Sequence, residues 1–177
     1  MKEFTIPWGI LKAKLSQKIF PLVNNPLLKT IRIRDDVAFG KNVTVINPSN
    51  LYGCKIGDNC FIGPFVEIQK DVLIGNNCKI QSHTFICELV TIGNNCFISH
   101  GVMFINDVFK IGKPAGGKKE LWKSTSIGNN VSIGTNATIM PVKIADNVVI
   151  GAGSVVTKNI TVSGIYAGNP AKKIRSL

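Results

Sequence analysis

The residues best suited to chemistry are His83 and His100, the only two histidines in the chain and seventeen positions apart. A neutral imidazole accepts a proton near pH 7, which suits general base catalysis. Zinc chemistry fits less well, because catalytic zinc sites built on histidine alone need three of them, and the five cysteines form no CxxC pair. Whether the two histidines form one site depends on the elements that hold them.

A six-residue repeat surrounds the histidines. Large aliphatic or aromatic residues recur at every sixth position from Ile56 to Phe104, and the frame resumes at Ile127, slips by one residue, and continues to Val156. A hexapeptide period is typical of a parallel β-helix, in which stacked coils bury an aliphatic layer that one coil could not bury alone. The sequence therefore predicts an all-β solenoid.

The same repeat accounts for most of the cysteines. A small or β-branched residue stands four positions after each large one, so both positions should face inward. Cys60, Cys78 and Cys96 fall in this small inward position, and Cys54 fits it if the frame is extended back to Asn50, so these four are predicted to be buried thiols. Cys87 lies outside that position and could be exposed.

This tandem pattern, [LIV]-G-x-x-[small]-x, resembles the hexapeptide-repeat acyltransferase superfamily from about residue 39 onward. The resemblance implies a left-handed parallel β-helix with three hexapeptides per coil, shaped as a triangular prism with helical or irregular caps. We therefore expect an N-terminal cap over residues 1–36 and a β-helix over 37–162. A loop over 107–126 should interrupt the β-helix, and residues 163–177 should form a C-terminal capping segment associated with coenzyme A (CoA).

Eighteen residues per coil place residue i beside residue i+18, one strand spacing of about 4.8 Å away. The first corner repeats Gly, Asn and Asp from residues 57–59 onward, and these residues tolerate the left-handed backbone of tight turns. At the second corner the sequence is Gly-Pro-Phe (63–65), then Gln-Ser-His (81–83), then Ser-His-Gly (99–101). The usual turn residues are replaced there, and the two histidines should be neighbours on adjacent coils.

The third corner places Glu88 directly on Asn106 and precedes a break in the period. The position equivalent to Ile92 falls at Ile127 instead of position 110, so the excursion is 17 residues long. Loops of more than about 12 to 15 residues in compact domains are usually functional or disordered. This loop contains Trp122 and several lysines, among them Lys118 and Lys119, which suits contact with phosphates and a flat ring. A solvated basic lid with Trp122 packed on the prism is the alternative.

The C-terminal sequence GIYAGNPAKKIR, residues 164–175, resembles the closing segment of superfamily members that use acetyl-CoA. The resemblance implies that the pantetheine arm lies parallel to the prism axis, between neighbouring subunits of a homotrimer. Candidate cofactor-binding residues are Lys172, Lys173 and Arg175 for the CoA phosphates, and Gly134, Thr135, Asn136, Ala152 and Gly153 along the arm. A basic tail that only caps the β-helix is the alternative for each cation taken singly.

Residues 83–107, HTFICELVTIGNNCFISHGVMFIND, with KPAGGKKELWK after them, look most like N-acetyltransferases of nucleotide-linked 3-amino sugars. The resemblance implies acetyl transfer from acetyl-CoA to the amine of a UDP- or dTDP-linked sugar, for O-antigen or other surface glycans. His83 is the first choice for a general base and His100 the second, while Asn106 and Asp107 are candidates for sugar contacts. Glu88 could orient the base only if a neighbouring subunit closes the distance.

Composition limits the partners. The 177 residues suit one domain, and the formal net charge of +11 favours an anionic partner, which we take to be the nucleotide sugar and CoA and not nucleic acid. No apolar run reaches the roughly 18 to 20 residues that span a bilayer. The N-terminal stretch around Trp8 lacks a signal-peptide pattern and should cap the first coil, although its basic helix leaves peripheral membrane attachment open. We expect a cytoplasmic protein without metal.

Three other readings remain. A sugar O-acetyltransferase on the same fold would need a histidine as an obligatory base, because a hydroxyl has a far higher pKa than an amine. A γ-type carbonic anhydrase would need three histidines on zinc. A β-helix without enzymatic activity, such as a scaffold or an ice-binding prism, would expose regular threonine arrays. Either histidine could also be simply solvent-facing, and the pairing of Glu88 with Asn106 could be a plain ladder hydrogen bond.

Overall fold

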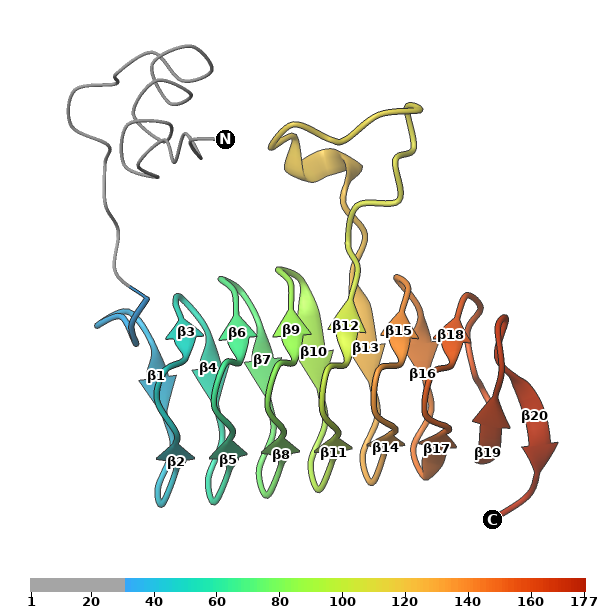
Figure 1. The fold of residues 1–177 in the computed structure, drawn as a ribbon, viewed down its shortest axis with the longest axis horizontal. Coiled ribbons are helices and arrows are strands. Elements are labelled where there is room, and N and C mark those ends of the chain that lie inside the picture. Colours follow the sequence, from blue (N-terminus) through green and yellow to red (C-terminus); the bar gives the residue numbers. More distant parts are fainter. Residues whose placement is uncertain (1–30) are drawn as a thin grey trace, which may run out of the picture. The chain divides into compact units, whose positions relative to one another are not determined.

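The computed structural model describes residues 31–177, which form a parallel β-helix with three faces (Figure 1). The first sheet contains β1 (Ala38–Phe39), β4 (Lys55–Ile56), β7 (Leu73–Ile74), β10 (Val90–Ile92), β13 (Thr125–Ile127) and β16 (Lys143–Ile144). The second contains β2 (Thr44–Val45), β5 (Phe61–Ile62), β8 (Lys79–Ile80), β11 (Phe97–Ile98), β14 (Ser132–Ile133), β17 (Val148–Ile150), β19 (Gly164–Ala167) and β20 (Lys172–Arg175). The third contains β3 (Asn50–Leu51), β6 (Glu67–Ile68), β9 (Phe85–Ile86), β12 (Met103–Phe104), β15 (Thr138–Ile139) and β18 (Val155–Val156). The all-β fold is confirmed, and it agrees with the left-handed β-helix expected.

The register follows the sequence period. Phe61 pairs with Lys79 and Lys79 with Phe97, each eighteen residues on, so neighbouring coils stack directly. Thr91 pairs with Ser126, thirty-five residues away, which equals one coil plus the predicted excursion of seventeen. The loop therefore leaves the β-helix between β12 and β13 without disturbing the coils on either side.

The core is a column of aliphatic layers inside the prism. Inward residues such as Ile62, Ile80 and Ile98 are fully buried, as the period predicts. The four cysteines in the small inward position are buried too: Cys54, Cys60, Cys78 and Cys96. The possibility that Cys87 is exposed is wrong, because it is 3% exposed and belongs to the same hydrophobic core.

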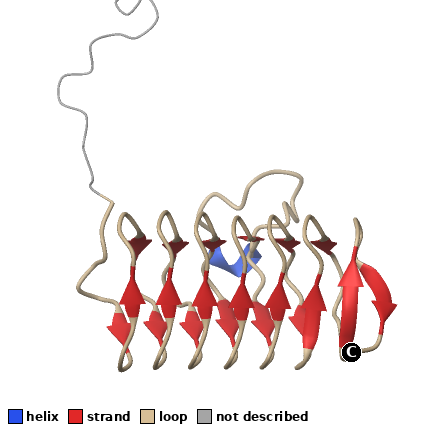
Figure 2. Cartoon of the chain, turned by 60° about the horizontal axis from the view of Figure 1, so that its bottom comes forward, coloured by secondary structure: helices blue, strands red, loops and turns tan. Residues whose placement is uncertain are grey.

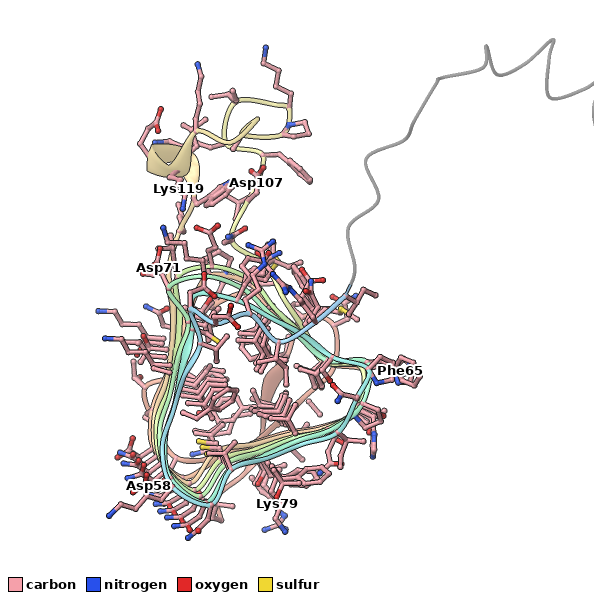
Figure 3. All side chains as sticks on the ribbon, turned by 90° about the vertical axis from the view of Figure 1, so that its left-hand side faces the viewer. Asp58, Phe65, Asp71, Lys79, Asp107 and Lys119 are labelled. Carbon is pink, nitrogen blue, oxygen red and sulfur yellow. The ribbon has the colours of Figure 1, made fainter. Side chains whose placement is uncertain are left out.

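Three edges join the three sheets and are labelled by Asp58, Phe65 and Asp71 in Figure 3. We call the edge between the first and second sheets the asparagine edge, because an asparagine with positive φ occupies each of its turns: Asn42, Asn59, Asn77, Asn95, Asn130 and Asn147. The edge between the second and third sheets is the histidine edge, which contains Phe65, His83 and His100. The edge between the third and first sheets, which carries Glu88 and the long loop, is the loop edge.

The C-terminal segment differs from the expected helical or irregular cap. Figure 2 shows it as two strands at the end of the β-helix. Strand β19 continues the second sheet in parallel with β17, and β20 then pairs with β19 in the antiparallel direction. The chain reverses its direction between β19 and β20 at the turn around Gly168, whose φ is +103°, and at the cis bond between Asn169 and Pro170. Because β19 still exposes an edge, adding a hairpin satisfies its backbone groups better than an irregular tail would.

The expected N-terminal cap over residues 1–36, with Trp8, lies outside the described residues except for its last six. No helix within residues 31–177 is both long and apolar enough to cross a membrane.

Candidate active site on the histidine edge

The asparagine edge shows what an ordinary corner of this prism does. The Nδ2 of Asn59 donates to Oδ1 of Asn77 at 3.3 Å, and the Nδ2 of Asn77 donates to Oδ1 of Asn95 at 3.2 Å. The neighbouring turn residue also binds the preceding coil, because Oδ1 of Asn76 accepts a hydrogen bond from the backbone N–H of Asp58 at 2.8 Å. The side chains of this edge are thus used to bind one coil to the next.

The histidine edge breaks this pattern. His100 Nδ1 lies 2.9 Å from Ser82 Oγ on the adjacent coil, and the backbone N–H of Gly101 donates to the Ser82 carbonyl at 3.0 Å. The structure therefore brings residues 81–83 and 99–101 together as the stacking predicts, although it pairs His100 with Ser82 and not with His83. The sequence reasoning placed Ser82 beside His100 but did not name it as a functional residue.

Two tautomers satisfy the contact between Ser82 and His100. If Nδ1–H donates to Ser82 Oγ, the lone pair on Nε2 of the exposed ring is free to accept a proton from a bound substrate. If Ser82 Oγ–H donates to Nδ1 instead, Nδ1 is the acceptor and the imidazole can activate the serine hydroxyl. In either case the contact with Ser82 orients the ring of His100. The ring of His83 has no such contact with Ser82.

His83 is held by an aromatic neighbour instead. Its ring stacks on that of Phe65, with centroids 4.9 Å apart and an interplanar angle of 28°. Both residues have positive φ, 59° for Phe65 and 63° for His83, and Phe65 is 57% exposed. A bulky residue in a left-handed turn is strained, and here burial does not offset that strain. The signal for Phe65 was in the sequence, since it occupies a turn position that Asn or Gly usually takes.

The predicted cofactor residues of the turns continue the same edge. Asn136 N–H donates to the His100 carbonyl at 2.9 Å, and Gly153 N–H donates to the Thr135 carbonyl at 2.8 Å. A Cβ on Gly101 would lie 2.2 Å from Asn136 Oδ1, so the amide of Asn136 leans over Gly101 toward the histidine coils. Gly134 and Ala152 are in close contact as well, because a Cβ on Gly134 would lie 2.5 Å from the Ala152 nitrogen.

The three predicted cations, Lys172, Lys173 and Arg175, lie on β20, and every residue of that strand is exposed. The structure places them on the terminal hairpin of the second sheet, a sheet that also borders the histidine edge. They are free to contact an anion.

Glu88 belongs to the loop edge, away from His83. Its carboxylate forms an ion pair with Lys119 of the loop, and its carbonyl accepts a hydrogen bond from Asn106 Nδ2 at 3.2 Å. Stacking of Glu88 on Asn106 is therefore confirmed. Within residues 31–177 the side chain of Glu88 is engaged by the loop and not by a histidine.

The loop itself contains a short 3-10 helix, η1 (Lys119–Leu121), visible above the prism in Figure 1. Lys119 Nζ lies 5.7 Å from the centroid of the Trp122 ring, a cation–π distance. The hydrogen bond to Glu88 raises the pKa of Lys119, which stays charged. Lys118 is exposed on the same helical end, and Asp107 is turned inward to accept loop backbone N–H groups.

Two of the cysteines, Cys54 and Cys87, and the possible metal ligands contribute little to a site. Burial raises the pKa of Cys54 to about 11 and that of Cys87 to about 12, so neither thiol is a ready nucleophile. Within residues 31–177, no three side chains of His, Cys, Asp or Glu are grouped closely enough to hold a metal ion.

Two family models match the chain, one on each side of the loop. The bacterial transferase hexapeptide (six repeats) matches residues 53–88, and the hexapeptide repeat of succinyl-transferase matches residues 124–158. Among curated relatives, a chloramphenicol acetyltransferase of Morganella morganii is 52% identical over 52 residues, 29% of this chain and 25% of that protein. The galactoside O-acetyltransferase of Escherichia coli (strain K12) is 53% identical over 53 residues, 29% of this chain and 26% of that protein. These matches span about a quarter of the relatives' length.

Solved structures match over a larger part of the chain. AntD, an N-acyltransferase from Bacillus cereus in complex with dTDP and 3-hydroxybutyryl-CoA, has a TM-score of 0.69 at 25% identity, covering 77% of this chain and 81% of AntD. A variant of AntD in complex with dTDP and coenzyme A matches at 26% identity with a TM-score of 0.69, covering 78% of this chain and 83% of the other. A maltose O-acetyltransferase from Clostridium difficile 630 has a TM-score of 0.50 at 26% identity, covering 79% and 69%. Together with the two repeat models, these likenesses support placing the chain in the hexapeptide-repeat acyltransferase superfamily.

Proposed function

We propose that the protein is an acetyl-CoA-dependent N-acetyltransferase that acts on the amino group of a nucleotide-linked 3-amino sugar, with dTDP or UDP as the nucleotide. The product would serve O-antigen or another surface glycan, and the reaction would take place in the cytoplasm. The observation that carries the proposal is the histidine edge, where polar and aromatic residues replace the asparagine turns over two coils. The likeness to AntD, which binds dTDP and an acyl-CoA, supports the choice of substrates.

Acetyl transfer to a sugar amine does not require a strong base from the protein. A sugar amine carries electron-withdrawing oxygen substituents, so a fraction of it is neutral near pH 7 and can attack the thioester carbonyl. The nitrogen forms the new amide bond, the carbon–sulfur bond of the thioester breaks, and CoA leaves as the thiol after the amine proton is passed on. An imidazole that accepts this proton would contribute about 10²- to 10⁴-fold.

Of the two histidines, His100 is better prepared to accept that proton. Its Nδ1 lies 2.9 Å from Ser82 Oγ, and in the tautomer whose Nδ1–H donates to that oxygen, Nε2 is free to accept the substrate proton. His83, stacked on Phe65, is better placed to support a flat or apolar part of a ligand. This reverses the order expected from the sequence, in which His83 came first.

The cofactor would lie along the histidine edge. Residues 134–136 and 152–153 stack in line with His100 and offer small side chains, so a pantetheine arm could approach the backbone closely. Lys172, Lys173 and Arg175 would then meet the CoA phosphates. A single prism offers only an open edge here, which is the reason to propose that a second subunit of a homotrimer completes the site.

The decisive experiment incubates the protein with acetyl-CoA and a panel of UDP- and dTDP-linked 3- and 4-amino sugars, and follows release of free CoA. We expect release with at least one 3-amino sugar, with a product heavier by one acetyl group in mass spectrometry. No release with any amine in the panel would overturn the proposal.

An O-acetyltransferase is the second candidate, favoured by the likeness to galactoside and maltose O-acetyltransferases. Replacing both histidines, His83→Asn with His100→Asn, separates the two functions. With an amine acceptor we expect kcat to fall by about 10²-fold or less, while a hydroxyl acceptor would lose about 10⁴-fold because it needs the base. The same kcat measured at higher pH provides the check, since only the amine reaction should recover as more substrate becomes neutral.

A further inference from the structure

A cavity of about 310 Å³ opens between the loop and the third sheet, outside the histidine edge. Phe85 of β9 and Phe104 of β12 contribute from the sheet, while Phe109 and Trp122 contribute from the two arms of the loop. Asn106 and Asp107, where the loop begins, and Gln69, next to β6, add polar groups to the lining. Figure 3 shows the loop standing above this corner of the prism, with Asp107 and Lys119 on its two arms.

The cavity is held open by the way the loop is anchored. The carboxylate of Asp107 accepts the backbone N–H of Phe109 at 2.9 Å and that of Ala115 at 2.7 Å, which ties the far part of the loop to its base. The backbone N–H of Lys123 donates to the Asn106 carbonyl at 2.9 Å and closes the two arms. Ala115 is only 4% exposed, so the loop has a small packed centre of its own. A binding site anchored in this way needs little reorganisation to receive a ligand.

Packing within residues 31–177 does not account for the position of Phe109. Its side chain is 59% exposed and its φ is +51°, so a large apolar residue is held in a strained conformation with much of its ring in solvent. Such strain is typical of a residue whose position is used by a ligand. Phe109 and Trp122 come from opposite arms and line one cavity, an arrangement suited to a flat ring between or against them.

The polar groups select the kind of ring. Asn106 Nδ2 is used by the Glu88 carbonyl, whereas Asn106 Oδ1 has no hydrogen-bond partner among residues 31–177. An amide oxygen in an aromatic cavity can accept the N3–H of a pyrimidine such as thymine or uracil. The loop also supplies positive charge for phosphates through exposed lysines: Lys110, Lys113, Lys118 and Lys123.

We propose that this cavity binds the pyrimidine base of a nucleoside diphosphate. The base stacks on Trp122 and Phe109, its N3–H donates to Asn106 Oδ1, and its diphosphate faces the loop lysines. A volume of about 310 Å³ is at the small end for ligand sites, which fits a base better than a whole nucleotide sugar. This assignment rests on the proposed function and deepens it, because it gives the nucleotide handle of the substrate a site separate from the histidine edge.

Tryptophan fluorescence tests the assignment. The chain has two tryptophans, so the variant Trp8→Phe leaves Trp122 as the only one. Titrating this protein with dTDP, and separately with UDP, should quench the emission with a saturable curve. Binding that shows heat in calorimetry but leaves the Trp122 emission unchanged would mean that the base lies elsewhere, and would overturn the assignment.

Variants give the second measurement. In the full-length protein, Trp122→Ala should weaken dTDP binding by about tenfold or more, the usual cost of losing an aromatic ring stacked on a base. Trp122→Phe keeps a ring and should recover most of the affinity, which shows that a collapsed loop is not the cause. Phe97→Ala is the matched control, because Phe97 is 40% exposed on the second sheet and should leave the affinity unchanged. Equal affinity in all three variants would also overturn the assignment.

Kinetics separate this assignment from the proposed function. Turnover of an amino sugar with an unchanged KM in Trp122→Ala would refute the cavity and keep the acetyltransferase. Quenching by dTDP without turnover of any amine would keep the cavity and refute the acetyltransferase. A change of subunit number in Trp122→Ala, measured by light scattering, would show that a second copy of the chain occupies the cavity, and this too would overturn the assignment.

Discussion

The asparagine edge and the histidine edge have the same backbone and opposite uses. Both make a left-handed turn once per coil, at Asn77 on one edge and at His83 on the other, with φ of 58° and 63°. On the asparagine edge the side chains bond to the coil before and the coil after. On the histidine edge, Phe65 and His83 form a ring stack in place of such hydrogen bonds, and His100 pairs with Ser82 of the adjacent coil.

The difference shows how a repeat fold makes room for chemistry. Asparagine in a left-handed turn carries little strain, and its amide contributes two hydrogen bonds to the ladder. Phenylalanine and histidine at the same turn position are more strained in the left-handed conformation and do not form these ladder hydrogen bonds. The histidine edge gives up these contacts at Phe65 and His83 on adjacent coils, and because strained positions are often found at functional sites, we propose that the site lies there.

The largest expected effect comes from filling a glycine on each edge. A Cβ on Gly93, on the asparagine edge, would lie 2.7 Å from the backbone carbon and oxygen of Gly128, which cannot move without shifting a coil. A Cβ on Gly101, on the histidine edge, meets only the side chain of Asn136, which can rotate away. We expect Gly93→Ala to lower the free energy of unfolding by about 3 kcal/mol, an overpacking cost. Gly101→Ala should cost about 1 to 2 kcal/mol, from its positive φ alone.

Chemical denaturation of the two glycine variants measures this difference directly. Equal losses would show that the side chain of Asn136 is as firmly held as the backbone of Gly128, and would contradict the expected difference between these two positions. Gly101→Ala should in addition slow acetyl transfer by more than its stability loss explains, because the new methyl group stands beside His100.

Exchanging the turn residues between the edges should have the next largest effect. Asn77→His removes one hydrogen bond to Asn59 and one to Asn95 and puts a bulkier residue in a left-handed turn, so we expect a loss of about 1 to 2 kcal/mol. His83→Asn makes the reverse change, and relief of strain should leave stability unchanged or raise it by up to about 1 kcal/mol.

Thermal melts and the CoA-release assay, run side by side, test the exchange. Asn77→His should lower the melting temperature and leave the rate per folded molecule unchanged. His83→Asn should leave the melting temperature unchanged or raise it, and should lower the rate per folded molecule. If His83→Asn melts well below the parent protein, His83 is a structural residue and the histidine edge is not specialised for function.

The sequence period predicted the fold well and the site in part. Period-six hydrophobic residues led to the coils, the buried thiols and the neighbourhood of residues 82 and 100, because each follows from counting along a regular repeat. Counting also places Phe65 beside His83, eighteen residues on, and only the geometry of their ring stack needed the structure. Counting fails for Cys87, which is buried although it lies outside the small inward position of the repeat. The C-terminal hairpin was missed for the same reason, since the repeat had ended before it.

The smallest expected effect concerns the loop edge, which tests whether Glu88 belongs to the histidine edge at all. In the chain, Glu88 pairs with Lys119, and its hydrogen bond raises the lysine pKa. Because the folded pKa of Lys119 is raised, the pair contributes at neutral pH, where both groups are charged, and is lost as pH rises through the raised lysine pKa. Lys119 is largely in solvent, so Glu88→Gln should leave the melting temperature almost unchanged and only speed hydrogen exchange in the loop at neutral pH.

The contact is isolated by comparing Glu88→Gln, Lys119→Gln and the double variant. Each single change should speed exchange of residues 108–121 to the same degree, and the double variant should add nothing, because both remove one ion pair. If Glu88→Gln instead shifts the pH dependence of kcat while Lys119→Gln does not, Glu88 acts on a histidine. In the described chain Glu88 meets the loop and not His83, so a partner subunit would have to bring the two together. That outcome would give the loop edge a share in catalysis and would make the site a property of the assembly, whereas unchanged pH profiles in both variants confine catalysis to the histidine edge.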